Sequence, residues 1–504
     1  MKIRIVSNSK HILSVKIIIL AAVIGLINSF FYGNLMIMLA LCALEVFILL
    51  YCLIKNDDLH YLCFYLIFLC FSMESETFVG TSIFYGFKNF RIAGLNLSMW
   101  MLCPLILKSI LGLQSSKKYM GSVHKAILNR ISFFTILGSL MGILTYLSND
   151  NGFMMAKGSF SILFSTYYAY IVPFLEVLVA SYVVVQNADR IQIIKQYLFS
   201  CIIALSIVFI ACLVLGNYGN RGGLMSLQVS DIYFLLVSSL ALLVYPQFDK
   251  KTRSCLLFSS LIILILSLAY NTSGKIVITT ILTPIAMIVI MAKQGSSTKT
   301  LVMVGVAVFG LIIASQIIFP YLMSSSRLFA IKFEQASDMF SFGSGDWLRN
   351  MASSPKMRIT EFMNIAAEYV LKPWYAIFGK GFVGTIKDNL HLFDELSTFA
   401  FSEWELHLRA YFSMHESVNC FFLVGGISGL YIIFSISLKI FSNIHKSPWL
   451  VFGFMWILLF YNYHMSIAIY GVIALAVGLQ DVALWKENIT ANGMRGIDYV
   501  NTGN

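Results

Sequence analysis

The sequence predicts an all-α protein that crosses a membrane many times. Hydrophobic residues make up 59% of its 504 residues and charged residues only 12%, whereas soluble domains carry about 25% charged residues. The mean hydropathy is +0.81. Apolar runs of about 20 residues, the length that spans a bilayer as a helix, follow one another with short breaks. We count about fourteen such runs.

These runs divide the chain into four parts. Residues 1–320 hold eleven predicted membrane helices, and residues 415–485 hold three more. Between them, residues 321–414 form one large loop that is rich in charged residues, glycines and tryptophans. Residues 486–504 form a polar tail. Because the loop is the longest polar stretch, we expect the functional site to be built on it.

The distribution of positive charge predicts the orientation in the membrane. If the N-terminus is cytoplasmic, the cytoplasmic segments hold 21 of the 35 Lys and Arg residues, the short outer segments hold 5 and the long loop holds 9. Lys and Arg are enriched in cytoplasmic loops, so we expect both termini in the cytoplasm and the long loop outside. The net charge of +11 then reflects topology, and no nucleic-acid partner is needed to explain it.

Cysteine and histidine usage does not predict a disulfide or a metal site. All nine cysteines lie in or beside apolar runs and none forms a CxxC pair, so we interpret them as small buried hydrophobic residues. His391, His407 and His415 lie near acidic residues but lack the HxH or HxxxH spacing of metal ligands. We expect neither a metal nor another cofactor.

Within the long loop, residues 356–370 are predicted to form an amphipathic helix. They follow two serines and a proline, which is typical of a helix start. Apolar residues recur at helical spacing and predict one face packed on the membrane helices: Phe362, Ile365, Ala366 and Tyr369. Pro373 would end the helix, and the glycines at 379, 381 and 384 allow a tight backbone turn.

Four basic residues are candidates for binding an anion. Arg221 lies among glycines in an outer loop, and Arg358 opens the predicted loop helix. Lys380 lies between two glycines, and Lys275 lies at an outer membrane boundary. Arginine suits phosphate because its planar guanidinium donates two parallel hydrogen bonds. Simpler interpretations stay open: Arg221 binds lipid headgroups or pairs with Asp231, Lys275 snorkels to the interface, and the other two face solvent.

His415 begins the apolar run 415–438 at its outer end. The ordinary pKa of histidine, ~6.5, suits general acid–base work, although a histidine here can also be an interfacial cap. Glu416 follows and can either orient the imidazole or face solvent. Farther along, Gly425 and Gly429 form a GxxxG pattern, which is typical of close helix packing.

Together these features resemble the O-antigen polymerases and O-antigen ligases, a superfamily of bacterial membrane glycosyltransferases that act on lipid-linked sugars. His415 to Gly429 is similar to the ligase pattern H-[N/S/Q]-x9-G-x-x-G. Arg358 to Gly381 is similar to the family's run of arginine, amphipathic helix, proline and G-x-G. Arg221 lies where the family places another arginine in an earlier outer loop.

The resemblance covers roughly residues 200–480, and two positions depart from it. Position 416 is Glu where the ligase pattern has Asn, Ser or Gln, and Lys275 stands where relatives often have arginine. The first departure, with the number of predicted membrane helices, favours a polymerase over a ligase.

The resemblance implies a GT-C-like fold and an inverting, metal-independent glycosyltransferase. It would act at the periplasmic face of the bacterial inner membrane, with undecaprenyl-diphosphate-linked oligosaccharides as donor and acceptor, and build O-antigen or a related surface polysaccharide. A chain-length regulator and a flippase of the same pathway would be partners. His415, Arg221 and Arg358 would be catalytic. The residues that would bind substrate are Lys275, Lys380 and Glu416.

Three alternatives stay open. A ligase would use the same chemistry to move finished polymer onto lipid A–core. A flippase or other transporter of lipid-linked sugars would need a charged central cavity and often has internal repeats, whereas this chain shows no repeat and few mid-span charges, Glu45 and Glu176 being exceptions. A scaffold without activity is the third.

Overall fold

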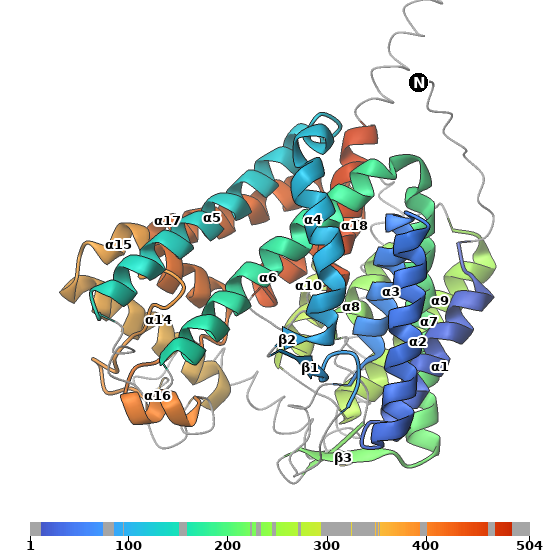
Figure 1. Cartoon of the computed structure of the whole chain (residues 1–504), viewed down its shortest axis with the longest axis horizontal. Helices are drawn as coiled ribbons and strands as arrows, with labels where there is room; N and C mark the ends of the chain where they lie inside the picture. Colours follow the sequence, from blue (N-terminus) through green and yellow to red (C-terminus); the bar gives the residue numbers. More distant parts are fainter. Residues whose placement is uncertain are drawn as a thin grey trace, which may run out of the picture.

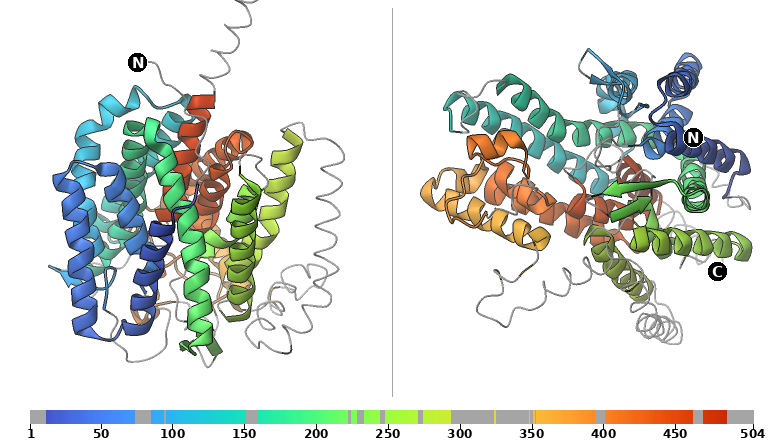
Figure 2. Two further views of the ribbon diagram at one scale, coloured as in Figure 1. Left: turned by 90° about the vertical axis from the view of Figure 1, so that its right-hand side faces the viewer. Right: turned by 90° about the horizontal axis from the view of Figure 1, so that it is seen from below.

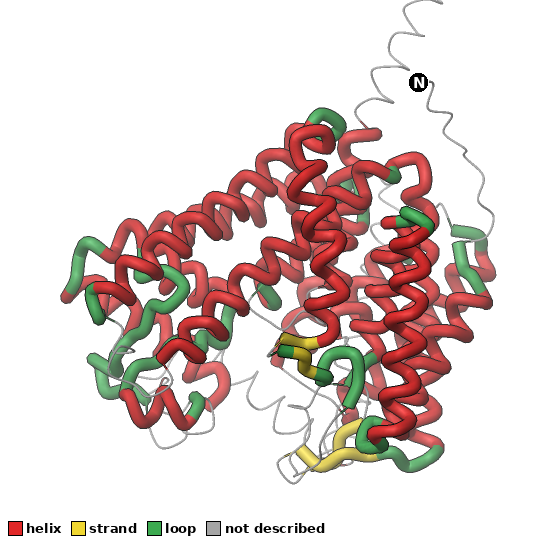
Figure 3. Tube along the Cα trace, in the orientation of Figure 1, coloured by secondary structure: helices red, strands yellow, loops and turns green. Residues whose placement is uncertain are grey.

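The computed structural model describes residues 12–73, 85–93, 95–150, 159–221, 224–227, 233–243, 248–270, 274–293, 324, 348, 351, 353–393, 401–461 and 469–485. Within these ranges nearly all of the chain is helical (Figure 3), which confirms the all-α prediction. The strands described there form two short antiparallel hairpins: β1 (Arg91–Ile92) with β2 (Leu95–Asn96), and β3 (Tyr218–Arg221) with β4 (Leu224–Leu227).

Among the described residues, six helices are long and apolar enough to cross a membrane: Leu35–Ile54, Leu97–Lys117, Ser122–Leu147, Thr166–Gln186, Ala188–Val214 and Ser417–Asn443. The chain is therefore a polytopic membrane protein by its helices as well as by its composition. The expected count of about fourteen stays a prediction, as does the outer position of the long loop, because most of residues 294–352 lie outside the described ranges.

The described helices before the long loop are α1 (Val15–Phe31), α2 (Leu35–Ile54), α3 (Asp58–Phe71), α4 (Leu97–Lys117), α5 (Ser122–Leu147), α6 (Ser159–Gln186), α7 (Ile191–Val214), α8 (Tyr233–Leu242), α9 (Lys250–Tyr270) and α10 (Gly274–Lys293). In the loop and after it lie α14 (Ser353–Leu371), α15 (Tyr375–Phe378), α16 (Glu403–Leu408), α17 (Ser417–Asn443), α18 (Trp449–Leu459) and a last helix over Ile469–Trp485.

Helix α5 shows how these apolar helices divide between lipid and protein. Large apolar side chains three and four residues apart are exposed along one face: Phe133, Ile136, Leu140, Ile143, Leu144 and Leu147. The opposite face is buried and carries Phe134, Gly138 and Gly142 against Phe382 of the loop and Val424 of α17. An exposed apolar stripe at helical spacing is what a helix in contact with lipid presents.

The loop helices lie at one end of the molecule. Helices α14 and α15 contact α17, and α17 contacts α5, so these elements form a unit at the far end of the two long helices (Figure 1). Viewed from below, the orange loop helices lie on the opposite side of the molecule from the blue N-terminal helices (Figure 2). The polar part of the chain is therefore seated on α5 and α17.

Helix α17 is interrupted within its membrane-spanning part. Gly426 has φ +60° and ψ −145°, a combination that is essentially restricted to glycine. The GxxxG pattern predicts close packing between helices, but Gly429 packs closely against its own helix. A Cβ on Gly429 would lie 1.9 Å from the carbonyl oxygen of Phe421. A Cβ on Gly425, by contrast, would meet only the ring of Phe134, at 3.5 Å. The glycines thus permit the break in α17 as well as close packing between helices.

Candidate functional site

Helix α14 confirms the helix predicted for residues 356–370, and its buried face is more polar than the pattern indicates. Ile365 and Tyr369 are buried as expected. The same face also buries Glu361, Asn364 and Glu368, which are 0%, 0% and 3% exposed. Since a buried carboxylate must be paired or hydrogen-bonded, this face is a polar surface with specific partners on α17 and in the following loop.

Glu361 contacts His415, which lies two residues before the first residue of α17. Oε1 of the carboxylate is hydrogen-bonded to Nδ1 of the imidazole, and Oε2 accepts a hydrogen bond from the backbone N–H of His415 at 3.1 Å. The carboxylate is 0% exposed, whereas the imidazole is 28% exposed. His415 is therefore held from the protein side and open on the other, as a group that meets a substrate must be.

Asn419 fixes the carboxylate of Glu361 from one turn farther along α17. Its amide Nδ2 donates to Oε2 of Glu361 at 2.9 Å and to the backbone carbonyl of Arg358 at 2.8 Å. Each carboxylate oxygen thus has a donor, and the asparagine links α17 to α14.

The pKa of His415 is set by two opposing effects. Burial lowers it, but the hydrogen bond to Glu361 and the negative charge of Glu361 outweigh burial, so the pKa is raised above 6.5. Arg358 acts against the rise and Glu405 adds to it. The imidazole is therefore cationic over a wider pH range than an ordinary histidine.

Arg358 and Glu416 form an ion pair beside the histidine. Nε of the guanidinium is hydrogen-bonded to Oε1 of Glu416, and the two side chains are 25% and 17% exposed. The structure thus brings together three of the predicted site residues, His415, Arg358 and Glu416, at the junction of α14 and α17.

The other two candidate cations on the earlier outer loops are placed only by their backbones. Arg221 is the last residue of β3 and pairs with Leu224 of β4. Lys275 lies in the first turn of α10. Their side chains lie outside the described part of the structure, so their participation in the site stays a prediction.

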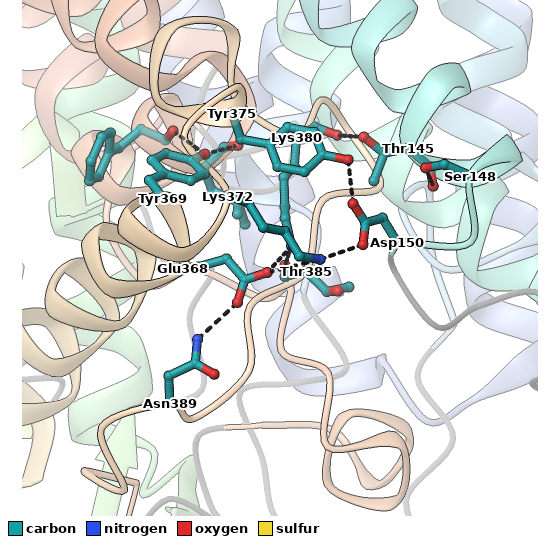
Figure 4. A network of polar contacts seen from close by, with 12 residues as sticks. Thr145, Ser148, Asp150, Glu368, Tyr369, Lys372, Tyr375, Lys380, Thr385 and Asn389 are labelled. Carbon is teal, nitrogen blue, oxygen red and sulfur yellow. Dashed lines mark hydrogen bonds and ion pairs between the residues drawn. The ribbon is translucent and has the colours of Figure 1, made fainter.

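Lys380 is buried, not presented to solvent as the glycines on either side suggest. It is 1% exposed, and its ammonium donates to Oε1 of Glu368 at 2.6 Å and to the backbone carbonyl of Thr385 at 2.8 Å (Figure 4). Burial lowers the pKa of Lys380 and Glu368 opposes this; Lys380 lowers the pKa of Glu368 in turn. With its charge committed to Glu368, Lys380 is not among the residues that we assign to substrate.

Glu405 orders the chain that leads into His415. It caps α16 through a reciprocal capping box with Ser402, and Oε1 accepts from the backbone N–H groups of Phe412 and Ser413 at 2.8 and 2.7 Å. Across the described ranges, no group of three or more His, Cys, Asp or Glu side chains is placed to hold a metal ion.

Three residues that hold the site were not predicted from the sequence: Glu361, Glu368 and Asn419. For the two glutamates the sequence contained a weak signal. Glu361 follows Arg358 by three residues and Glu368 follows Glu361 by seven, which puts Arg358, Glu361 and Glu368 on one helix face. The apolar residues on neighbouring positions masked this stripe. For Asn419, one turn after His415, the same helical spacing was the available clue.

The arrangement can accept a proton next to a bound anion. When His415 is neutral, the Nδ1 proton is directed to Glu361, which leaves the lone pair on Nε2 free to accept a proton from a hydroxyl. Arg358 supplies a positive charge at the same junction. A base, its orienting carboxylate and a cation are the components expected of a site for group transfer from an anionic leaving group.

Comparison of the chain with models of known protein families gives no match, and comparison with curated proteins gives none either.

Proposed function

We propose that this protein is a membrane-embedded inverting glycosyltransferase that polymerises undecaprenyl-diphosphate-linked oligosaccharides at the periplasmic face, as an O-antigen polymerase or the polymerase of a related surface polysaccharide. The observation that carries the proposal is the pairing of His415 with the buried carboxylate of Glu361, next to Arg358. The family resemblance of these same positions supplies the substrate class.

In the proposed reaction, a hydroxyl of the acceptor sugar attacks the anomeric carbon of the donor from the face opposite the diphosphate. The new C–O bond forms as the bond to the lipid diphosphate breaks, and the electron pair leaves on the diphosphate. Nε2 of His415 takes the hydroxyl proton, and Glu361 stabilises the imidazolium that results. General-base help of this kind contributes about 100- to 10,000-fold.

Arg358 would stabilise the diphosphate as negative charge builds on it. In the structure the guanidinium of Arg358 is paired with Glu416. The diphosphate would therefore compete with the Glu416 carboxylate for this guanidinium. Arg221 and Lys275 complete the proposed anion-binding set from the earlier loops.

The test is polymer formation by purified protein in liposomes that contain undecaprenyl-diphosphate-linked oligosaccharide. We expect a ladder of products for the wild type and a loss of about 100- to 10,000-fold in kcat for His415→Ala, with Arg358→Ala also strongly reduced. His407→Ala is the matched control, because this histidine is exposed on α16. Wild-type rates in folded His415→Ala would overturn the proposed role of His415.

The same assay separates the alternatives. Product that appears only on an added lipid A–core acceptor would identify a ligase. Movement of lipid-linked sugar between leaflets without a new glycosidic bond would identify a transporter. For a transporter the residue to examine first is Glu176 of α6, which is 1% exposed and whose carboxylate lacks a hydrogen-bond partner among the described residues.

A further inference from the structure

The break in α17 removes helical hydrogen bonds just below the candidate site. Because Gly426 leaves the helical conformation, the carbonyls of the preceding turn, those of Phe422, Leu423 and Val424, need donors from elsewhere. A backbone carbonyl left unpaired inside a membrane protein is costly. The first part of α17, which carries Asn419 and directly follows His415 and Glu416, therefore depends on partners outside the helix.

The long loop supplies those donors. The hydroxyl of Tyr369 lies 2.9 Å from the carbonyl oxygen of Phe422 and 2.7 Å from that of Leu423. The backbone N–H of Lys380 donates to Leu423 at 2.9 Å, and the next N–H, of Gly381, donates to Val424 at 3.0 Å. One side-chain hydroxyl and two backbone N–H groups of the loop thus face three successive carbonyls of α17.

The glycines that flank Lys380 permit this approach. Gly379 and Gly381 have φ of +69° and +71°. A Cβ on Gly379 would lie 2.4 Å from the backbone of Val424, and one on Gly381 would lie 1.9 Å from the backbone nitrogen of Gly142 in α5. The loop is wedged between α5 and α17 at a distance that only glycine allows.

Inside this wedge, Lys380 joins the loop to α14. Its ammonium is paired with Glu368, and the other carboxylate oxygen of Glu368 accepts from Asn389 at 2.9 Å (Figure 4). The backbone carbonyl of Lys380 accepts a hydrogen bond from the hydroxyl of Thr145 in α5 at 2.8 Å. Removing one partner of such a buried pair leaves an uncompensated charge, so the pair strongly favours this one arrangement.

Helix α14 connects this pair to the candidate site. Glu361 and Glu368 lie about 10.5 Å apart along α14, which is two helical turns. Glu361 is paired with His415, and Glu368 is paired with Lys380. The residues that follow each glutamate, Phe362 and Tyr369, pack on the ring of Phe422, with ring centroids 4.9 and 5.1 Å from it. The first part of α17 is therefore fastened to α14 at both ends.

We propose that Lys380 and Glu368 form a positioning pair, the latch, which holds the loop in the break of α17 and thereby keeps His415 in contact with Glu361. The latch does not touch substrate; it acts through the backbone hydrogen bonds to Leu423 and Val424. Its catalytic consequence rests on the proposed function, whereas its structural consequence does not.

The first test is independent of activity. Histidine C2-hydrogen exchange read by mass spectrometry gives the pKa of His415 in purified protein. Among the described residues, the charges that act on this pKa are those of Glu361, Arg358 and Glu405. We expect Lys380→Met to move this pKa down towards 6.5, because the imidazole loses its contact with Glu361. Lys387→Met is the matched control: Lys387 lies in the same loop as Lys380, but its side chain is exposed.

If Lys380→Met does not fold, the double variant Lys380→Met/Glu368→Met is measured instead, since it leaves no unpaired charge. An unchanged pKa of His415 in whichever folded variant is measured would overturn the latch. A change as large in Lys387→Met would overturn it as well, because the effect would then not be specific to the buried pair.

The second test is kinetic and uses the liposome assay. We expect the latch variant to lower kcat on the order of 100-fold with KM for the lipid-linked donor little changed, because the reacting group is misplaced while substrate still binds. A change in KM alone would overturn the positioning role. If the wild type forms no polymer but the pKa of His415 responds to Lys380→Met, the proposed function fails and the latch stands.

Discussion

At the scale of single residues, Glu361 is the organising group of the candidate site. One buried carboxylate accepts from the imidazole and the backbone of His415 and from Asn419. It thereby sets the ring orientation, the tautomer and the pKa of His415 together. In a dry environment each of these effects is stronger than at a surface.

Glu361→Gln is expected to move the acid limb of the pH–kcat profile to lower pH. The proposed base must be neutral to act, so activity rises as pH passes the pKa of His415. Glu361 raises this pKa, and the neutral amide removes the charge that does so, while burial, which lowers the pKa, remains. The measurement is polymer formation as a function of pH for the wild type and the variant.

Glu416→Gln serves as the comparison, because the ion pair of Glu416 is with Arg358. Its limb should stay near that of the wild type. An identical limb in Glu361→Gln and the wild type would show that the titration of His415 does not govern the rate.

At the scale of elements, α17 consists of two helical parts whose junction is filled by the loop. Membrane helices tolerate such breaks where neighbouring groups satisfy the freed backbone, and here Tyr369, Lys380 and Gly381 do so. A Cβ on Gly426 would lie 2.6 Å from the carbonyl oxygen of Ala376 in α15. The break is therefore built for this particular loop.

Gly426→Ala is expected to destabilise the protein strongly. The backbone conformation alone costs about 1–3 kcal/mol for a residue with a side chain, and the contact with the carbonyl of Ala376 adds to it. Gly425→Ala is a close control, since its Cβ meets only the ring of Phe134 at an ordinary 3.5 Å. Thermal unfolding in detergent should show a lower Tm for the first variant only; equal Tm values would contradict the tight junction.

At the scale of the whole molecule, the loop helices are seated on α5 and α17 at one end, and the C-terminal helices fill the interior. Two tryptophans of α18, Trp449 and Trp456, are almost completely buried. The same holds for Tyr461, which follows α18, and for Tyr470 of the last helix. Lys195 of α7 pairs with Asp481 of the last helix at 2.9 and 3.0 Å. The helix Ile469–Trp485 is thus part of the bundle on which the site rests.

Fusion reporters test the predicted orientation of this assembly. Green fluorescent protein placed after residue 504 should fluoresce, because the C-terminus is expected in the cytoplasm. Alkaline phosphatase fused after Asn389, within the long loop, should be active, since that loop is expected in the periplasm. The reverse pattern would place the candidate site in the cytoplasm and exclude the proposed periplasmic reaction.

The sequence by itself predicts an all-α membrane protein and some of the residues of the candidate site. Apolar runs and scarce charge identify a membrane protein because the bilayer imposes length and polarity on every helix that crosses it. Helix α14 was predictable since its start signal and periodicity are local. His415 and Arg358 stood out because charged and titratable residues are rare in this chain.

Only the tertiary structure decided what these residues contact. Glu361 and His415 lie 54 positions apart, and the partner of Lys380 was concealed because a lysine between two glycines has the sequence signature of an exposed turn. The GxxxG pattern of Gly425 and Gly429 indicated close packing, whereas the structure has a break at Gly426 between them. Local sequence permits this conformation, but the loop that fills the break decides that it forms. The chain itself determined where helices and charges lie; packing between distant segments determined which charges are buried, paired and left to act.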